Sequence, residues 1–495
     1  MRPLVYHHTP GKLFAFASDA HALLRHGAIA CEINDERIAD FFENRESFDF
    51  TSTFFRGLHR LSPAHALLIE DGQLRIWRYW QLDPPQRLTL PSDEAYAEAL
   101  RAVFSQAVSD RLRSAEPVGA MLSGGMDSGS TVAVAAPLLK AAGAPPLATF
   151  SAVSTNPRCV ETRAIRAAQT MAHIDPVSIS LEDFGAYRDD LAHMTRTMGQ
   201  PFDTMPWNMA VYIAARRRNI KVVLDGAAGD TLFDADNMVA WNLRRGNLAQ
   251  AWREARGDRM FYGPNVSVVG ALLEGVRYVV VPQFLRDLKA SLTAGYRNWA
   301  EERASLLSPE FLRQIRNRDR QAAFERKAWV QLDGRFDDRR ALVRHRYILT
   351  ARERYDRIAA QAGIEARDPF LDRRLVEFVL TLPPDQMHKD GWPKIVMRRA
   401  MGGLLPDAVR WRVGKEHIGW EFEDALVASG LIEPSPKGLA LTSRYLRKRA
   451  ANGPNRGPGE QLQVACPAPV RYAALWVDQL VKDYLNGVRD EQNWK

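Results

Sequence analysis

One short segment constrains this chain more than any other: an apolar run that enters a glycine turn and then a helix of small residues. The apolar run is Val118-Gly-Ala-Met-Leu122, the turn is Ser123-Gly-Gly-Met-Asp-Ser128, and the small residues follow at 131–136. Free N–H groups at the start of a helix, together with the helix dipole, favour an anion such as phosphate. Gly124 and Gly125 let the backbone approach a ligand because they lack a Cβ atom. The segment therefore predicts a phosphate-binding turn at the carboxyl end of a strand.

The same turn carries an acidic residue that implies a bound cation. Phosphate would repel Asp127 at this position, so the residue predicts a Mg²⁺ ion that bridges carboxylate and phosphate. The turn lacks the Gly-Lys-Ser/Thr ending of a Walker loop, which indicates another way of holding a nucleotide. A tight strand-to-helix turn without a ligand is the plainer alternative. The adjacent glycines between Ser123 and Ser128 favour the phosphate-binding interpretation.

A second segment repeats this design further along the chain. The apolar strand Val222-Val-Leu224 enters the glycine-containing turn Asp225-Gly-Ala-Ala-Gly-Asp230. Open α/β sheets bind ligands at the carboxyl ends of their strands, so we expect Asp225 and Asp230 at the ligand-binding edge. Asp230 is the natural partner of Asp127 for Mg²⁺. An Asp-Gly turn with capping aspartates is the alternative interpretation.

Around these turns, short apolar strands alternate with helical segments. Strands are predicted at 118–122, 147–151 and 222–224, and helices at 161–172 and 208–216. Such alternation is typical of a parallel, doubly wound sheet, so the predicted fold class is α/β. After about residue 240 the pattern is mostly helical and basic. The Gly- and Pro-rich stretch 450–459 is expected to be a flexible loop.

The first part of the chain has a different texture. Apolar runs at 13–17 and 66–69 predict short strands, and Asp71-Gly72 predicts a hairpin turn after the second run. A linker containing prolines follows at 83–91, and Ser92 is the expected N-cap of the next helix. The N-terminal part is therefore predicted to be a separate, mostly β region.

A third block, between residues 363 and 416, contains one acidic and three basic residues that are candidates for catalysis or phosphate binding. Glu365 could act as a general base for an incoming ammonium group, or it could form a plain ion pair with Arg367. Lys394, Arg398 and Lys415 are cations of the kind that neutralises the phosphates of a nucleotide and a developing pyrophosphate. Solvated side chains on helix surfaces are the alternative for these three residues.

Together the three blocks resemble the asparagine synthetase family, whose synthetase domain contains a nucleotide-binding PP-loop. Ser123–Ser128 matches the family's Ser-Gly-Gly-x-Asp-Ser loop, and Glu365–Asp372 matches its Glu-x-Arg-x-Pro-Phe-Leu-Asp signature. The resemblance covers nearly the whole chain up to about residue 425. It implies a doubly wound PP-loop ATP-pyrophosphatase domain at 92–430, preceded by a partial, mostly β Ntn-hydrolase-like amidotransferase domain at 1–85. A C-terminal extension is expected at 431–495.

The resemblance also implies roles for single residues. ATP and Mg²⁺ would be the cofactors, with Asp127 and Asp230 as the metal ligands. Glu365 would lie beside the reacting carbonyl, and Lys415 would stabilise the adenylate and the tetrahedral intermediate. Leu122 and the nearby backbone would contact adenine. The nucleotide-binding residues would be Leu122, Ser123, Gly124, Gly125, Asp127, Ser128, Gly226, Lys394 and Arg398.

Two departures from the family pattern affect what the chain is expected to do. The family's glutaminase half begins with a cysteine directly after the initiator Met, whereas Arg2 follows Met1 here and the first cysteine is Cys31. We therefore expect an N-terminal domain that is naturally truncated or begins at a misplaced start, and that cannot hydrolyse glutamine by the family's route. At 225–233 asparagine synthetases usually read Ser-Gly-Glu-Gly-Ala-Asp-Glu-Leu-Phe, but this chain reads Asp-Gly-Ala-Ala-Gly-Asp-Thr-Leu-Phe. Altered loops of this kind are similar to those of β-lactam and carbapenam synthetases and of lasso-peptide cyclases.

Composition excludes several other classes of protein. With 46% hydrophobic and 25% charged residues, no apolar run long enough to cross a bilayer and no signal-peptide core, the chain is predicted to be cytoplasmic. The scattered cysteines Cys31, Cys159 and Cys466 indicate neither a disulfide framework nor a thiolate metal site. The net charge of 67 − 59 = +8 could attract nucleic acid, but a basic, solvated surface is favoured because no zinc-finger spacing or RNA-recognition motif accompanies the charge.

The leading hypothesis is an ATP-dependent, AMP-forming carbon–nitrogen ligase related to asparagine synthase. It would adenylate a carboxylate, that of an aspartate or glutamate side chain, and release AMP and pyrophosphate after an amine attacks. Free asparagine synthesis and lasso-peptide macrocyclisation are nearly equal alternatives for the reaction. A β-lactam-type synthetase, a non-catalytic nucleotide-binding relative and a PP-loop enzyme acting on RNA are further alternatives. The substrate would be an amino acid or a precursor peptide, and the partner an ammonia-supplying protein, a leader-peptide-binding protein or a second copy of the chain.

Overall fold

The computed structural model describes most of the chain. The described residues are 3–42, 51–82, 86–156, 158–180, 182–198, 205–233, 237–281, 305–316, 319–320, 346–414, 421–422, 425–426, 435–446 and 468–480. Lys415 and the stretch 450–459, both singled out by the sequence, lie outside these residues. Within the described residues, no helix is long and apolar enough to span a membrane.

A five-stranded parallel sheet forms the centre of the molecule, with strand order β10-β9-β6-β7-β8. Its strands are β6 (Val118–Met121), β7 (Leu147–Val153), β8 (Ile174–Ser180), β9 (Val222–Leu224) and β10 (Glu365–Arg367). The three central strands are almost entirely buried, which explains their continuous apolar character in the sequence. Because β6 pairs in parallel with both β7 and β9, the turns that follow β6 and β9 meet at one edge of the sheet.

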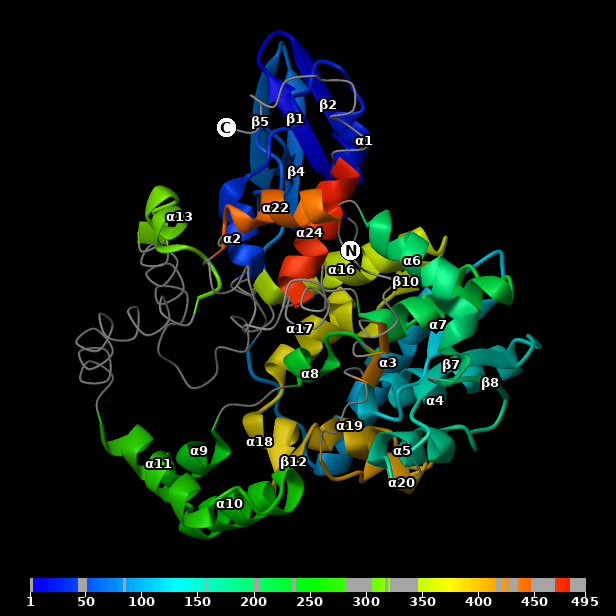
Figure 1. Ribbon diagram of the computed structural model, residues 1–495. Helices are drawn as coiled ribbons and strands as arrows, with labels where there is room; N and C mark the ends of the chain where they lie inside the picture. The colour runs from blue at the N-terminus through cyan, green and yellow to red at the C-terminus, as the bar shows by residue number, and fades with distance from the viewer. Residues whose placement is uncertain are drawn as a thin grey trace, which may run out of the picture.

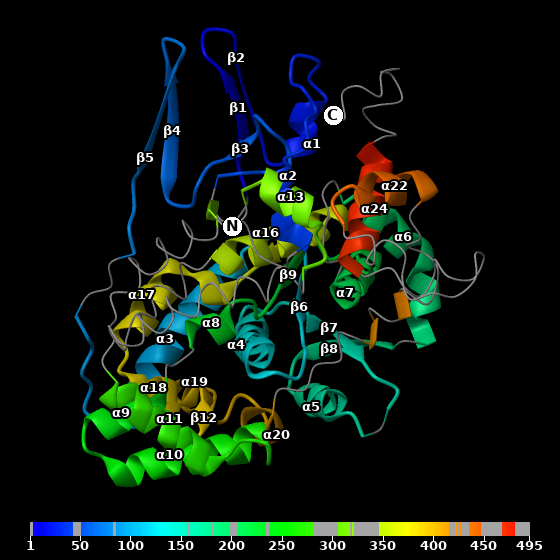
Figure 2. The same ribbon diagram turned by 60° about the vertical axis from the view of Figure 1, so that its left-hand side comes forward.

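Helices cover both faces of this sheet, as the α/β prediction requires (Figures 1 and 2). One face carries a core that includes buried residues of α3 (Asp93–Arg111), α4 (Met126–Ala141), α17 (Arg373–Thr381) and α19 (Ile395–Ala400). The other face carries a core that includes α6 (Arg188–Arg196), α7 (Pro206–Arg217) and α16 (Arg346–Gln361). Short connecting elements are α5 (Val160–Ala168), α8 (Gly229–Leu232), α18 (Pro384–Met387), α20 (Asp407–Arg410), η1 (Glu182–Tyr187) and η2 (Pro369–Leu371). The doubly wound α/β prediction is confirmed.

The N-terminal region is rich in strands and packs on helices from much later in the sequence. Its elements are β1 (Val5–Thr9), β2 (Leu13–Ala17), α1 (Ala20–Leu24), α2 (Asp35–Phe42), β3 (His59–Arg60), β4 (His65–Glu70) and β5 (Gln73–Arg78). Phe54 and Phe55 of this region pack against Trp476 of α24 (Ala468–Leu480). The shared core also includes residues of α13 (Pro309–Gln314). The predicted C-terminal extension thus completes the core of the N-terminal region, together with α22 (Pro436–Ser443), which contacts α24. The predicted domain boundaries themselves stay a prediction.

A smaller helical group lies at the opposite end of the molecule from the N-terminal strands (Figure 1). It consists of α9 (Met238–Arg244), α10 (Leu248–Tyr262) and α11 (Val268–Val280), which contact one another. Next to α10 lies a two-stranded hairpin of β11 (His388–Lys389) and β12 (Trp392–Pro393). This hairpin leads directly into α19, so its position sets where the side chains of residues 394–398 lie.

Several local predictions are confirmed, with small shifts at the ends of elements. The hairpin turn at Asp71-Gly72 joins β4 to β5, and both residues have positive φ, 49° and 74°. Ser92 is the N-cap of α3, where its side chain accepts a hydrogen bond from Ala95 N at 3.2 Å. The helix predicted at 208–216 begins at Pro206, a residue suited to the first turn because its missing N–H would have no partner there. The strands β8 and β10 were not predicted.

Candidate active site

The first glycine turn is held closed by two serines. Ser123 N donates to Ser128 Oγ at 3.0 Å, and the two hydroxyl oxygens are 2.9 Å apart. Gly125 is the N-cap of α4 and has no side chain to occupy the free N–H groups of the first helical turn. Gly124 has φ +66°, and a Cβ atom there would overlap the backbone of α5 at Ile165. The turn therefore needs its glycines, and the start of α4 stays open to an anion.

The second glycine turn packs directly against the first. Asp225 Oδ1 accepts a hydrogen bond from Ala227 N at 2.8 Å, which shapes the turn before α8. A Cβ atom at Gly226 would lie 2.6 Å from Ser128 N, and one at Gly229 would overlap the carboxylate of Asp127. Since any larger residue would separate them, the two glycines are what let the two turns touch. This contact brings the acidic residues of both turns to one place.

A lysine from the hairpin segment joins these acidic residues. Lys394 Nζ lies 2.5 Å from both carboxylate oxygens of Asp127 and 2.7 Å from Asp230 Oδ1. Burial alone would lower the pKa of Lys394, but the charges of Asp127 and Asp230 outweigh it, and the pKa is raised above its usual value. Lys394 is therefore a cation at neutral pH. It has the left-handed φ of +58°, so the backbone conformation that starts α19 also fixes its direction.

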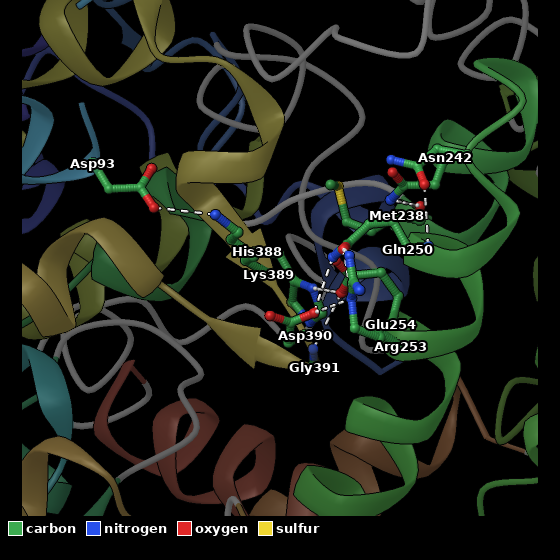
Figure 3. Close-up of polar contacts among 11 residues, drawn as sticks. Asp93, Met238, Asn242, Gln250, Arg253, Glu254, His388, Lys389, Asp390 and Gly391 are labelled. Atoms are coloured by element: carbon green, nitrogen blue, oxygen red, sulfur yellow. Dashed lines mark hydrogen bonds and ion pairs between the residues drawn. The ribbon is translucent and has the colours of Figure 1, made fainter. Parts of the chain in front are cut away.

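The hairpin that carries this lysine is anchored to α10 (Figure 3). Glu254 accepts hydrogen bonds from His388 Nδ1 at 3.2 Å and from Gly391 N at 3.1 Å, and its side chain is buried. Gly391 and Gly257 of α10 pack backbone against backbone, where a Cβ atom on either would overlap the other segment. On the other side of the hairpin, Lys389 Nζ donates to Asp93 at 3.0 Å. The anchoring fixes the start of α19 relative to the rest of the molecule.

Two arginines add positive charge near the first turn. Arg398 Nε donates to Pro393 O at 2.8 Å, and its guanidinium lies 4.9 Å from the ring centre of Trp392. Burial lowers the pKa of Arg398 to about 10, which still leaves it charged at neutral pH. Arg412 Nη1 donates to Gly124 O at 3.4 Å. Three cations, Lys394 included, thus surround the open start of α4.

These groups line one cavity of about 620 Å³. Nine of the residues predicted as binding or metal-ligating border it, from both turns and from the segment 394–398: Leu122, Ser123, Gly125, Asp127, Ser128, Gly226, Asp230, Lys394 and Arg398. Gly124 shapes the turn and presents its carbonyl to Arg412 without bordering the cavity. A volume of this size falls within the range of small-molecule and cofactor sites.

The structure places Glu365 away from this cavity. It begins β10, and successive residues of a strand point to opposite faces of the sheet. Ala366 belongs to the core on the α7 side, whereas Arg367 donates to the carbonyls of Arg111 and Arg113 on the α3 side. Glu365 shares the face of Arg367 and pairs with it at 3.1 Å. Its role as a general base stays a prediction, as does the role of Lys415, which lies outside the described residues.

The two predicted metal ligands converge, although no larger ligand cluster does. No group of three or more His, Cys, Asp or Glu side chains suited to a metal ion occurs among the described residues. Asp127 and Asp230 nevertheless meet at one positive charge, the ammonium group of Lys394. The side chain of Asp230 is 69% exposed, so it can reach a second cation that also contacts phosphate oxygens. The donor set therefore fits Mg²⁺ bound jointly by the protein and a nucleotide.

Sequence reasoning missed several cavity residues. Trp207 from the start of α7, Arg352 and Tyr355 from α16, and Arg412 all border the cavity. Arg412 lies in the third block, which the sequence analysis already connected with phosphate binding through Lys415. Nothing in the sequence distinguishes Arg412 from the other arginines of that block. The others lie on helices whose spacing indicates only burial. Only the tertiary packing of α7 and α16 over the sheet brings them to the cavity.

Comparison with known proteins agrees with this geometry. The family model described as "Asparagine synthase" matches residues 99–433, which is more than half of the chain. The chain belongs to the asparagine synthase family. A second model, described as "Glutamine amidotransferase domain", matches residues 1–80. The asparagine-synthetase resemblance and the amidotransferase-like N-terminal region inferred from the sequence are both confirmed.

Curated relatives of the family align with most of this chain. "Asparagine synthetase [glutamine-hydrolyzing] 3" of Bacillus subtilis (strain 168) is 26% identical over 418 residues, which cover 81% of this chain and 61% of that protein. "Asparagine synthetase [glutamine-hydrolyzing] 2" of the same organism is 26% identical over 436 residues, covering 82% of this chain and 51% of the relative. The enzyme of Rattus norvegicus is 42% identical over 62 residues, 12% of this chain and 11% of that protein. The chain thus spans about half to three fifths of the length of the two Bacillus relatives.

The N-terminal region of this family member offers no reactive thiol among its described residues. Cys31 is its one cysteine, and burial raises the pKa of that thiol to about 11. A thiolate is the nucleophilic form of cysteine, so burial disfavours the reactive form of Cys31. Cys159 lies elsewhere, at the N-cap of α5, where its sulfur accepts from Thr162 N at 3.4 Å.

Proposed function

We propose that this chain is an ATP-dependent ligase that adenylates a carboxylate and joins it to an amine, with release of AMP and pyrophosphate. The observation that carries the proposal is the meeting of the two glycine turns at Lys394, beside the open start of α4 and within a cavity of about 620 Å³. An open helix N-terminus surrounded by three cations suits a nucleotide with several phosphates. Membership of the asparagine synthase family supports the same reaction class.

Different residues of the cavity would bind different parts of ATP. The serines and N–H groups of the first turn bind phosphate oxygens, and buried Leu122 supplies apolar contact for adenine. Lys394 and Arg398 stabilise the negative charge that develops on the departing pyrophosphate. Asp127 and Asp230 would hold Mg²⁺, which neutralises the phosphates and orients them when bound. Glu365, which does not border the cavity, stays a candidate for the general base, and Lys415 as a contact to the adenylate completes the proposal.

The substrate class is a carboxylate on an amino acid, with the side chain of aspartate or glutamate as the first choice. Ammonia, produced elsewhere or by a partner protein, would be the amine for free asparagine synthesis. A second candidate is the closure of an amide ring on a precursor peptide. It is favoured by the departure at the second turn, where Asp225 lies buried beside the cavity and Ala227 stands where asparagine synthetases have Glu. Such a change alters the acceptor side and leaves Asp127, Asp230 and Lys394 in place.

Product analysis tests this proposal. Purified protein is incubated with Mg·ATP, L-aspartate and ammonium chloride, and the nucleotide products are separated; L-glutamate replaces L-aspartate in a parallel reaction. We expect AMP and pyrophosphate in equal amounts, and we expect Asp127→Asn to abolish them because a metal carboxylate is lost. Formation of ADP and phosphate would contradict the assignment. If the free amino acids give no AMP, a precursor peptide encoded beside the gene is the substrate to test for the second candidate.

A further inference from the structure

A second buried acidic pair lies beside the cavity, and the phosphate-binding site makes no use of it. Asp225 follows β9 and Asp368 follows β10, two neighbouring parallel strands. Because side chains alternate along a strand, both residues share the face of Val223 and Ala366, the face that α7 and α16 cover. Asp225 is 3% exposed and Asp368 is 6% exposed. Two carboxyl groups are thus brought together away from bulk water.

The hydrogen bonds of this pair are incomplete. Asp225 Oδ1 accepts from Ala227 N, but among the described residues no N–H or O–H group donates to Asp225 Oδ2 or to Asp368 Oδ1. The negative charge of Asp368 also acts on Asp225 and favours a proton there. Arg352 of α16 forms an ion pair with Asp368 and also donates to Ala366 O at 3.3 Å. Buried polar atoms without partners are rare, and each of them calls for a ligand or a proton.

The charges around the pair favour keeping that proton. Burial, followed by the charge of Asp368, raises the pKa of Asp225 well above its usual range, against the opposing charge of Arg352. Among the described residues, Tyr212 of α7 and Tyr355 of α16 also face the pair, and the charge of Asp356 acts on Arg352. Burial and the charge of Asp225 raise the pKa of Tyr212 well above its usual value, so that this phenol stays neutral. Burial and the nearby negative charge therefore favour a proton on Asp225, whereas Arg352 opposes it.

Asp225 also faces the place where acyl transfer would occur. It borders the cavity together with Arg352 and Tyr355. The next residue, Gly226, packs on Ser128 N in the first turn, so Asp225 lies one residue from backbone that contacts the phosphate-binding turn. A carboxyl group whose pKa is raised is a stronger proton acceptor than an ordinary one, and proton transfer from an ammonium group becomes less unfavourable. The position and the chemistry both suit the amine half of the reaction.

We propose that Asp225 binds the ammonium group of the acceptor and accepts its proton, with Asp368 and Arg352 as positioning residues. The inference rests on the proposed ligase function. On binding, the ammonium group displaces the proton of Asp225 to water. One proton then passes from nitrogen to the Asp225 carboxylate. The nitrogen lone pair forms the C–N bond with the acyl carbon. The bond between the acyl carbon and the phosphate oxygen breaks, and its electron pair leaves with AMP. A second N–H proton is then released to water.

The first test separates deprotonation from the rest of the reaction. Wild type and Asp225→Asn are assayed with Mg·ATP and L-aspartate for pyrophosphate–ATP exchange, for amide formation from ammonium, and for hydroxamate formation from hydroxylamine. Hydroxylamine is largely neutral at pH 7 and needs no proton acceptor before it attacks. We expect Asp225→Asn to keep exchange and hydroxamate formation while amide formation falls by about 10²–10⁴-fold, the usual contribution of a general base. An equal loss with both nucleophiles, or no loss, would overturn the inference.

A matched control guards against damage to the fold. Asp372 is also buried and paired with an arginine, Arg111, at 2.5 Å, but it lies on the α3 side. Asp372→Asn should lower the stability of the protein and leave the ratio of hydroxamate to amide as in the wild type. Asp368→Asn should change that ratio in the same direction as Asp225→Asn, by a smaller factor. If Asp372→Asn changes the ratio as much as Asp225→Asn does, the effect is structural and the inference is wrong.

A second test needs no turnover. Methylammonium chloride is titrated into wild type and Asp225→Asn in two buffers with different heats of protonation, with sodium chloride at matched ionic strength as the reference. We expect the wild type to release a proton on binding methylammonium, and the variant to release none. Absence of that proton release in the wild type would overturn the inference even if pyrophosphate–ATP exchange is normal. Absence of exchange in the wild type with proton release intact would instead contradict the proposed function.

Discussion

Two cations of the hairpin segment, His388 and Lys394, each lie between two carboxylates, but only Lys394 borders the cavity. His388 Nδ1 lies 3.2 Å from Glu254 and its Nε2 lies 3.4 Å from Asp258, both on α10. Lys394 Nζ lies 2.5 Å from Asp127 and 2.7 Å from Asp230, in the two glycine turns. In each case burial alone would lower the pKa of the cation, and in each case two carboxylates outweigh burial and raise it. The same charge pattern therefore occurs at both ends of one short segment.

The difference between the two groups lies in what surrounds them. The side chain of Glu254 is 1% exposed, and the contact between Gly257 and Gly391 closes the group around His388 on the backbone side. The side chain of Asp230 is 69% exposed, and Lys394 borders the cavity. The most exposed member of the first group, Asp258, is 26% exposed, but that group does not border the cavity and holds the hairpin in place. The second group presents charge to a ligand. A buried ion triad thus becomes a binding site where one of its members is open to solvent.

The largest effect is expected at the group formed by Lys394, Asp127 and Asp230, which we call the open triad because Asp230 is exposed. Lys394→Met keeps most of the side-chain length and removes the charge, so that pyrophosphate loses a buried cation contact. We expect pyrophosphate–ATP exchange to fall by about 10²–10³-fold, as for other lost contacts to developing negative charge. Lys389→Met is the matched control, because Lys389 belongs to the same hairpin but pairs with Asp93, outside the cavity. Equal losses in the two variants would show that the effect comes from the hairpin and not from the charge of Lys394.

A smaller effect is expected where a glycine lets the open triad form. In Gly229→Ala the new Cβ atom would overlap the carboxylate of Asp127, so that either this carboxylate or the second turn must move. We expect pyrophosphate–ATP exchange to fall by up to about 10²-fold, since a misplacement of roughly 1 Å at a reacting site has that cost. Gly185→Ala is the control, because a Cβ atom there meets open space. Unchanged exchange in Gly229→Ala would mean that the contact between the turns does not position Asp127.

The sequence predicted more of the open triad than of any other part of the site. Strand-to-glycine-to-helix patterns are local, and they predicted both turns, the parallel sheet and the convergence of Asp127 and Asp230 at its carboxyl edge. The signal is strong because glycines are needed where backbone approaches backbone, as at Gly124 and Gly226. Lys394 was predicted as a phosphate contact, and the structure adds its pairing with both aspartates.

Two other groups could not be predicted in the same way. One is the closed triad of His388, Glu254 and Asp258, and the other is the acidic pair of Asp225 and Asp368. Glu254 and His388 are far apart in the sequence, and nothing local indicates that α10 packs on the hairpin. The three-residue strand β10 is too short for a periodic signal, so the sequence did not show which face Glu365 would take. Asp368 lies on the face of the sheet that α7 and α16 cover, whereas Glu365 and Arg367 lie on the opposite face, and a shift of one residue in register would exchange the two faces. Such information comes from strand pairing and not from the motif.

The smallest effect on chemistry, with a pH-dependent effect on stability, is expected at the closed triad. The carboxylates of Asp258 and Glu254 overcome burial and raise the pKa of His388 from 6.5 to about 9. The charged histidine therefore stabilises the fold fully below about pH 6.5, and this contribution is lost as the pH rises through about 9. His388→Gln removes the charge, so its free energy of unfolding should lie below that of the wild type at pH 6 and approach it near pH 9.5. The shift of the His388 pKa sets an upper limit of about 3.4 kcal/mol on the difference in the free energy of unfolding.

Urea denaturation at a series of pH values measures this effect. The difference between wild type and His388→Gln should be largest at the acidic end and should shrink across the range between 6.5 and about 9. His65→Gln is the control, because the ring of His65 hydrogen-bonds to the carbonyl of Pro63. Its strand, β4, lies far from α10 in both views of the molecule (Figures 1 and 2). Exchange activity at pH 7 should change by less than about tenfold in His388→Gln, since the closed triad positions Lys394 without touching the nucleotide. A difference in stability that is constant with pH would show that His388 is neutral in the fold, and the likeness between the two triads would then be one of geometry alone.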